Sequence, residues 1–466
     1  NCQIKSKLLR ISIRNKETMD LVKIISLFYV PLGIIGLFRP ILLLYLFISI
    51  TVLEYTPTAF GNFTNIKLFK IGSINFFMYD YLITLMAFLF IKLFFEDKHF
   101  FKEVIKKPIS IITIVFFLWE IFIAFLSYSK GFELQNIFRR IAVEAMIFLT
   151  ILVPLTKGLD LKKERLLNFC LLMGVILVVF GVLKYFVFQE IELTSSGTHR
   201  SLDGKAVIIL FFPICYVLFY KSYWRDNGLI STSYVLFVAA GIHFTGHRSG
   251  WIAFLFILTM WFLLDKDKIK VVWIPLFGIS MVLMLILVVT SVKPQRGTVF
   301  GDLIIRISDT FNLENRTTEE RFSKWEFTAN EIIKSPLLGL GRFVIYTSQL
   351  DEKNAARAAA FPEVNRAPHN MLATRLLHQG VLGLAVLIAF FYIVFRELLK
   401  LKAHDQDYIN LLTVFILAFI IYSLLNTSFS DQAGKIFLFI TIGLLNYEII
   451  SDYSPLMSES NLNNEC

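Results

Sequence analysis

Apolar residues run along this chain in blocks of roughly 16 to 25, each separated from the next by a short polar stretch. A helix needs about 20 apolar residues to cross the hydrocarbon core of a bilayer. The blocks predict transmembrane helices at 76–95, 108–127, 136–155, 166–188, 204–221, 229–245, 249–264, 271–291, 371–395, 407–425 and 433–450. Residues 22–55 form one further apolar stretch, interrupted by Arg39-Pro40, which fits either one span or two.

Composition agrees with this pattern. The 466 residues are 56% hydrophobic and only 18% charged, which is outside the usual range of a soluble domain. The net charge of +10 comes from Lys and Arg in short clusters between apolar blocks, so it indicates loops facing anionic membrane lipids rather than a nucleic-acid-binding surface. Two of the four cysteines, Cys170 and Cys215, fall inside predicted spans, and the other two lie at the ends of the chain. This spacing does not indicate a set of disulfides or a metal site.

The basic residues of the short loops predict the orientation. One alternating set of loops holds sixteen Lys and Arg residues and the opposite set holds five, so the first set is expected in the cytoplasm. With a cytoplasmic basic N-terminus, 22–55 crosses once, which gives twelve spans. We therefore predict an all-α polytopic membrane protein with five parts: a cytoplasmic N-terminus at 1–21, transmembrane helices at 22–291, an extracytoplasmic segment at 292–370, transmembrane helices at 371–450 and a cytoplasmic tail at 451–466.

The extracytoplasmic segment has local structure of its own. Thr317 and Glu320 have the spacing of a capping box. An amphipathic helix should follow, ended by Ser335-Pro336, with its apolar positions on one face. Those positions are Phe322, Trp325, Ala329, Ile332 and Ile333. Trp325 is expected to be an interfacial anchor, and Gly339 and Gly341 are expected to be turn residues rather than a phosphate-binding loop.

Candidate chemistry gathers on this outer side. Arg248 lies in a short turn between two spans, Arg321 opens the amphipathic helix and His369 precedes the 371–395 span. Guanidinium groups bind phosphate in a bidentate way, and histidine can take a proton from a hydroxyl near neutral pH. Taken singly, an outer arginine or histidine is usually structural. Together they suit the attack of a hydroxyl on a donor activated by a lipid diphosphate.

Inside the bilayer, Glu120 lies about 10 Å below the outer end of its span, by the rise per residue of a helix. Arg139 and Arg140 lie near the outer end of the next span and could pair with it. A structural ion pair is favoured over a contact with substrate.

Several short motifs together resemble the O-antigen ligase and Wzy O-antigen polymerase superfamily. They are Arg321–Trp325, Ser335–Gly341, and Pro368-His369-Asn370 followed after nine residues by Gly380-Val381-Leu382-Gly383. Gly246–Gly250 takes the place of the family's short arginine turn, although His247 and Ser249 depart from the usual Ser-Arg-Gly-like sequence.

This resemblance implies a GT-C-like helical glycosyltransferase of the bacterial inner membrane with both termini cytoplasmic. Its donor would be an undecaprenyl-diphosphate-linked glycan and its acceptor a glycan or lipid A-core. It would need no cofactor and no metal, and would invert the anomeric carbon. His369 would be the general base or would position the acceptor, Arg248 and Arg321 would hold the diphosphate, and Arg366 and Arg342 are secondary candidates by position.

Two alternatives differ in function. A polysaccharide flippase or transporter would share the number of spans, but we find no internal repeat with broken helices in both halves. An oligosaccharyltransferase of the Trp-Trp-Asp type lacks its signature, because the chain has no Trp-Trp pair. Within the enzyme hypothesis, ligase and polymerase both remain open.

Overall fold

The computed structural model describes residues 27–55, 67–71, 74–129, 134–156, 163–187, 192–193, 199–202, 206–220, 228–245, 247–264, 325, 328–341, 370–401, 406–426 and 432–453. Six helices in these ranges are long and apolar enough to cross a membrane, and six shorter apolar helices accompany them. The protein is therefore a multi-pass helical membrane protein, as the hydrophobic blocks predict.

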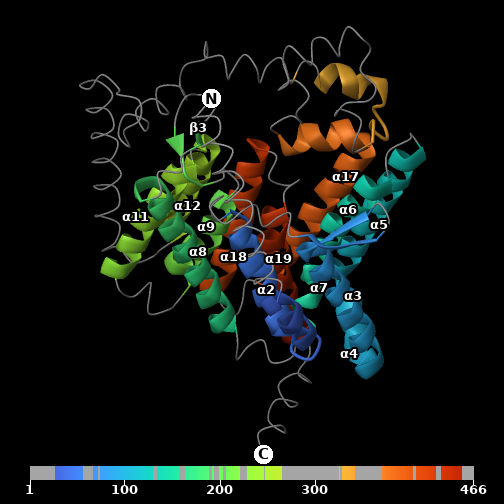
Figure 1. Ribbon diagram of the computed structural model, residues 1–466, viewed down its shortest axis with the longest axis horizontal. Coiled ribbons are helices and arrows are strands. Elements are labelled where there is room, and N and C mark those ends of the chain that lie inside the picture. The colour runs from blue at the N-terminus through green and yellow to red at the C-terminus, as the bar shows by residue number, and fades with distance from the viewer. Residues whose placement is uncertain are drawn as a thin grey trace, which may run out of the picture.

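The helices form one bundle with two sides and a centre (Figure 1). On one side lie α3 (Met78–Glu96), α4 (Lys98–Ile105), α5 (Pro108–Ser129) and α6 (Leu134–Ala145). On the other lie α8 (Lys163–Phe186), α11 (Gly228–Thr245) and α12 (Arg248–Leu264). The rest of the bundle is built from α2 (Pro40–Tyr55), α9 (Val207–Phe219), α17 (Met371–Lys400), α18 (Gln406–Leu424) and α19 (Gln432–Tyr453).

The centre of the bundle is α9, in which all thirteen residues are buried. It contacts α8, α11, α12, α18 and α19, which surround it. A helix that is apolar on every face is expected to be buried on every face, and the sequence of α9 has no charged residue. Short α9 is thus a core helix of the bundle as well as a predicted span.

Local sequence signals account for several helix ends. The Asp97 side chain accepts a hydrogen bond from the N–H of Phe100 (3.1 Å) at the start of α4, and Pro108 occupies the first position of α5. At the start of α17, the Asn370 side chain accepts from the N–H of Ala373 (3.0 Å). The residue directly after His369 therefore caps a helix.

Two predicted spans are interrupted. The block 136–155 folds as α6, the 3₁₀ turn η3 (Met146–Phe148) and the single-turn α7 (Leu149–Leu152). The stretch 22–55 contains the helix Leu27–Gly36 and α2, which begins at Pro40 as the Arg39-Pro40 break indicates. The Tyr29 hydroxyl donates to the Ser49 hydroxyl (2.8 Å), so the two helices run antiparallel. Ten residues cover about half of the hydrocarbon core.

Two small antiparallel hairpins add to the all-α architecture and were missed by the sequence interpretation. One pairs β1 (Lys67–Ile71) with β2 (Ile74–Phe77), directly before α3. The other pairs β3 (Glu192–Leu193) with β4 (His199–Arg200), between α8 and α9. The predicted span 271–291 lies outside the described residues.

The predicted amphipathic helix is present over 328–334 and ends at Ser335-Pro336. Its predicted apolar face is exposed on the protein: Trp325 is 44% and Ile333 74% accessible, whereas Thr328 is buried. An exposed apolar face suits contact with lipid at the membrane surface. Phe322 and the capping box lie outside the described residues.

Candidate functional site

The residues predicted to do the chemistry are mostly outside the described part of the chain. This holds for His369, Arg321, Arg342 and Arg366. Arg248 is the first residue of α12, and its side chain is not described. The structure therefore describes the framework that surrounds the predicted site, and that framework is built from the segments on either side of these residues.

The main feature of the framework is a break in α17 at Gly380, which has left-handed φ (63°) and extended ψ (−165°). In a continuous helix the N–H groups of Val381 and Leu382 would donate to the carbonyls of Leu377 and His378. The break separates these partners. Figure 1 shows the first turns of α17 lying across the top of the bundle, at an angle to the rest of the helix.

A second segment, residues 336–341, provides new hydrogen-bond partners for all four of these backbone groups. From N–H donor to carbonyl acceptor, the hydrogen bonds run from Val381 to Pro336 (2.8 Å), from Leu382 to Leu337 (3.2 Å), from Leu340 to Leu377 (2.9 Å) and from Gly341 to His378 (3.1 Å). Each of the two lost helical bonds is thus replaced by two bonds to the inserted segment. We call residues 336–341 and 377–382 together the junction.

The junction needs glycine at three positions. Gly339 and Gly341 also have positive φ (70° and 88°), a conformation that glycine adopts without strain. A Cβ on Gly339 would lie 2.3 Å from the backbone N of Gln379, and a Cβ on Gly380 would lie 2.3 Å from the carbonyl of Leu337. The Ser335–Gly341 motif and the Gly380 motif are therefore two halves of one structure.

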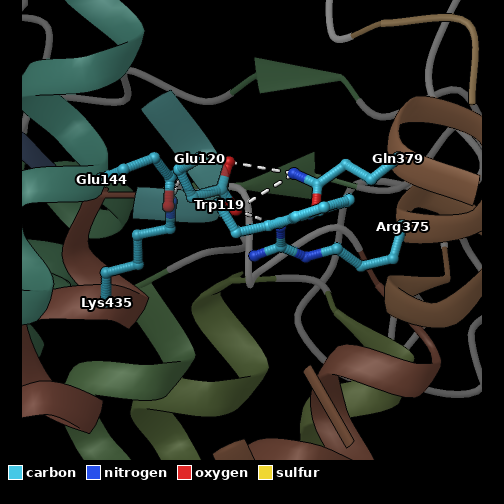
Figure 2. Close-up of polar contacts among 6 residues, drawn as sticks. All are labelled: Trp119, Glu120, Glu144, Arg375, Gln379 and Lys435. Carbon is cyan, nitrogen blue, oxygen red and sulfur yellow. Dashed lines mark hydrogen bonds and ion pairs between the residues drawn. The ribbon is translucent and has the colours of Figure 1, made fainter. Parts of the chain in front are cut away.

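Side chains from the first turns of α17 dock this junction onto α5. Arg375 and Gln379, one turn apart, both reach the buried carboxylate of Glu120 (Figure 2). Arg375 forms an ion pair with Glu120, and the Gln379 amide nitrogen lies 3.0 and 2.9 Å from the two carboxylate oxygens. All three residues are buried, so the charges neutralise each other away from water.

Two aromatic residues of α5 complete this cluster. The indole N–H of Trp119 donates to the side-chain oxygen of Gln379 (3.0 Å), and the Arg375 guanidinium lies 4.8 Å from the centre of the Phe116 ring. Because an indole N–H only donates and a carboxylate only accepts, the amide of Gln379 has one satisfactory orientation. Gln379 of α17 therefore contacts two neighbouring side chains of α5, Trp119 and Glu120, at once.

The same face of α5 meets the junction at two further points. A Cβ on Gly341 would lie 3.0 Å from the Ser127 hydroxyl, and one on Gly383 would lie 2.1 Å from the Cβ of Gln379 and 3.1 Å from the indole nitrogen of Trp119. Close backbone approach at both glycines lets α5 act as the platform on which the junction rests. This gives Gly383 of the predicted Gly-x-x-Gly motif a packing role.

The turn that carries Arg248 is held separately. The ring Nδ1 of His247 lies 2.7 Å from the Asn426 amide nitrogen and 3.2 Å from the Tyr422 hydroxyl. The Asn426 amide also donates to Tyr422 (3.0 Å). The residue just before Arg248 is therefore anchored to the C-terminal end of α18 and to Asn426 just after it. The departure from the family's usual turn, His247, is the residue that makes this contact.

Sequence reasoning missed most of this framework. It predicted a buried position for Glu120 and a pairing with Arg139 or Arg140, and it did not predict the ion pair with Arg375 that the structure shows. The side chains of Arg139 and Arg140 are not described. A usable signal was available, because Arg375 is a charged residue within an apolar span and Gln379 follows it by one helical turn.

The fold and the framework define a class: a multi-pass helical membrane protein with a broken helix whose break is held by hydrogen bonds to a second segment. Residues 233–388, about one third of the chain, match the protein family described as O-antigen ligase. This confirms the predicted resemblance to the O-antigen ligase and polymerase superfamily, and it supports an enzyme that acts on lipid-linked glycans in the membrane. No curated protein matches the sequence.

The matched region covers both halves of the junction and all five predicted site residues. It leaves out α5, which supplies Glu120, and α18, which supplies Tyr422 and is followed two residues after its end by Asn426. The matched region is thus held in place by contacts from two helices outside it.

Proposed function

We propose that this protein is an inverting glycosyltransferase that moves a glycan from undecaprenyl diphosphate to a sugar hydroxyl. The reaction would take place at the outer face of the bacterial inner membrane, in the synthesis of O-antigen, lipopolysaccharide or capsule. The proposal includes a GT-C-like arrangement of about twelve spans with both termini in the cytoplasm.

The observation that carries the proposal is the junction at Gly380, within the region that matches the O-antigen ligase family. It ties residues 336–341, which follow Arg321 and precede Arg342, to residues 377–382 of the helix that begins just after His369 in the sequence. A bond-forming site needs its groups held in a fixed relation, and a backbone clamp between these two segments supplies such a relation.

In the proposed mechanism the acceptor hydroxyl oxygen attacks the anomeric carbon from the face opposite the diphosphate. The bond between that carbon and the diphosphate oxygen breaks as the new glycosidic bond forms, so the configuration inverts. His369 accepts the hydroxyl proton, and undecaprenyl diphosphate leaves with its negative charge held by Arg248 and Arg321. Arg342 and Arg366 would add positive charge near the leaving group. We propose that no metal takes part, because the outer segment has no Asp-x-Asp motif.

The product distinguishes the two enzyme activities, and deletion of the gene in its own host tests them together. Loss of a polymerase leaves lipid A-core capped by one repeat unit. Loss of a ligase leaves long polymer attached to its lipid carrier. Repeat units trapped inside the cell, with transfer intact, would instead identify a flippase.

The mechanism predicts that His369→Ala abolishes transfer, because the attacking hydroxyl loses its proton acceptor. The measurement is glycan transfer by the purified full-length protein, with its amount in the membrane and its thermal midpoint as controls for folding. Wild-type transfer by a folded His369→Ala protein would rule out the proposed role of this histidine.

A further inference from the structure

The first nine residues of α17, 371–379, form a helical piece that Gly380 separates from the rest of the helix. A helix this short does not hold a direction of its own, so its neighbours must set its orientation. The junction fixes only its C-terminal end. His369 lies at the other end, just beyond the cap residue Asn370.

Small rotations about Gly380 are magnified at that far end. Nine helical residues measure roughly 14 Å, so a 10° change at the break moves the start of the helix by about 2 Å. A misplacement of about 1 Å at a reacting group can cost about a hundredfold in rate. The contacts that restrain residues 371–379 against α5 therefore bear directly on the position of His369.

The principal polar restraint is the Glu120 carboxylate. It contacts Arg375 and Gln379, two positions one turn apart on the same face of the short helix. Two attachment points restrict both the roll and the tilt of a helix, whereas one point restricts neither fully. A carboxylate is suited to this because both of its oxygens accept hydrogen bonds, so it can hold two donors at once.

From this geometry we infer that Glu120 is a positioning residue: through Arg375 and Gln379 it holds residues 371–379 at the angle from which His369 reaches the acceptor. The inference rests on the proposed role of His369. Glu120 touches no reacting atom in this scheme, and it acts only through the direction of the short helix.

The test is Glu120→Gln, which keeps the size of the side chain but turns one acceptor into a donor facing two donors. The donor probe is the lipid-linked glycan extracted from a deletion strain, and the acceptor is supplied by membranes of the same strain. We expect kcat per folded molecule to fall at least tenfold while the KM for the lipid-linked glycan stays within about twofold. Glu120→Asp keeps the charge and should recover much of kcat.

The matched control is Glu144→Gln, in the second buried ion pair, between Glu144 and Lys435. A residue with a merely structural role lowers the amount of folded protein and leaves kcat per folded molecule unchanged, which is the result expected for Glu144→Gln. If Glu120→Gln fails to fold, Gln379→Met tests the positioning role instead, since it removes one attachment point and keeps the ion pair. It should lower kcat about three- to tenfold.

The outcomes separate the inference from the proposed function. Wild-type kcat in folded Glu120→Gln or Gln379→Met, together with an inactive His369→Ala, overturns the positioning role and leaves the mechanism standing. Wild-type kcat in His369→Ala overturns the mechanism itself and the inference with it. A loss that appears only as a raised KM would place Glu120 in donor binding and also overturn the inference.

Discussion

Two ion pairs have both members buried in the part of the chain that the structure describes, and they differ in what they hold. Glu144 in the last turn of α6 pairs with Lys435 in the first turn of α19, so this pair joins the ends of two helices. Glu120 of α5 pairs with Arg375 in a helical piece that is broken off from its own helix. Glu120 also accepts from Gln379, which in turn accepts from Trp119.

The difference shows that a buried ion pair can serve two purposes. Burying two charges costs desolvation, so an ion pair adds little net stability over apolar packing of similar volume. The Glu144–Lys435 pair joins two helices that each keep a continuous backbone up to that point, so the pair is not needed to set their direction. Beside a glycine break, where the backbone gives no continuous direction, the pair and its hydrogen bonds supply that direction.

The largest effect is expected from removing the break. In Gly380→Ala the new Cβ would meet the Leu337 carbonyl at 2.3 Å, and alanine would keep a positive φ that costs roughly 1–3 kcal/mol. The junction should open and transfer should fall by two orders of magnitude or more, while the Glu144–Lys435 pair stays formed. Transfer rate and thermal midpoint are the measurements.

Gly36→Ala is the matched control, because its Cβ would make ordinary contact with Leu43 at 3.4 Å. A folded Gly380→Ala protein with the wild-type rate would show that the break does not matter for transfer.

The next largest effect is expected when the two buried ion pairs are compared, first with one charge removed and then with both charges removed. Lys435→Met strands a buried carboxylate and should cost about 3–5 kcal/mol of stability. The double variant Glu144→Leu/Lys435→Met should recover most of that loss with normal transfer per folded molecule. Glu120→Leu/Arg375→Met should recover stability in the same way but remain impaired in transfer. Unfolding in detergent and transfer rate, measured on all three proteins, give the comparison, and equal transfer in the two double variants would remove the distinction.

The smallest effect is expected at the edge of the cluster. Trp119→Phe removes the donor to the Gln379 side-chain oxygen and keeps most of the aromatic packing. The lost hydrogen bond should cost about 1 kcal/mol, and kcat should fall less than threefold because Glu120 still holds both partners. A loss as large as that of Glu120→Gln would mean that Trp119, rather than the carboxylate, fixes the amide.

Most of the spanning helices could be predicted from the sequence because the required signal is local. The blocks 76–95, 108–127 and 407–425 became α3, α5 and α18 with ends displaced by a few residues. A run of apolar residues of bilayer length forms a helix with little regard to its neighbours. The break between α6 and α7 has no such signal, since 136–152 contains neither proline nor glycine and Pro154 comes only after the end of α7.

The framework of the site could not be predicted because it depends on contacts across the chain. Glu120 and Arg375 are 255 residues apart, and a charge pattern does not say which basic residue meets which acid. The glycines of 339–341 read as an ordinary turn, and nothing in their spacing indicates that they enter a helix break forty residues later. Motif resemblance found both halves without showing that they pair.

The four backbone bonds at Gly380 have a consequence for how such a protein can diversify. They hold residue 341 against the helix that follows residue 370, so the two ends of the 28-residue stretch between them are fixed relative to each other. Lengthening a loop with fixed ends costs little, about 0.6 kcal/mol for each doubling. Insertions and deletions in this stretch can therefore vary its length while the break at Gly380 and its four hydrogen bonds keep their places.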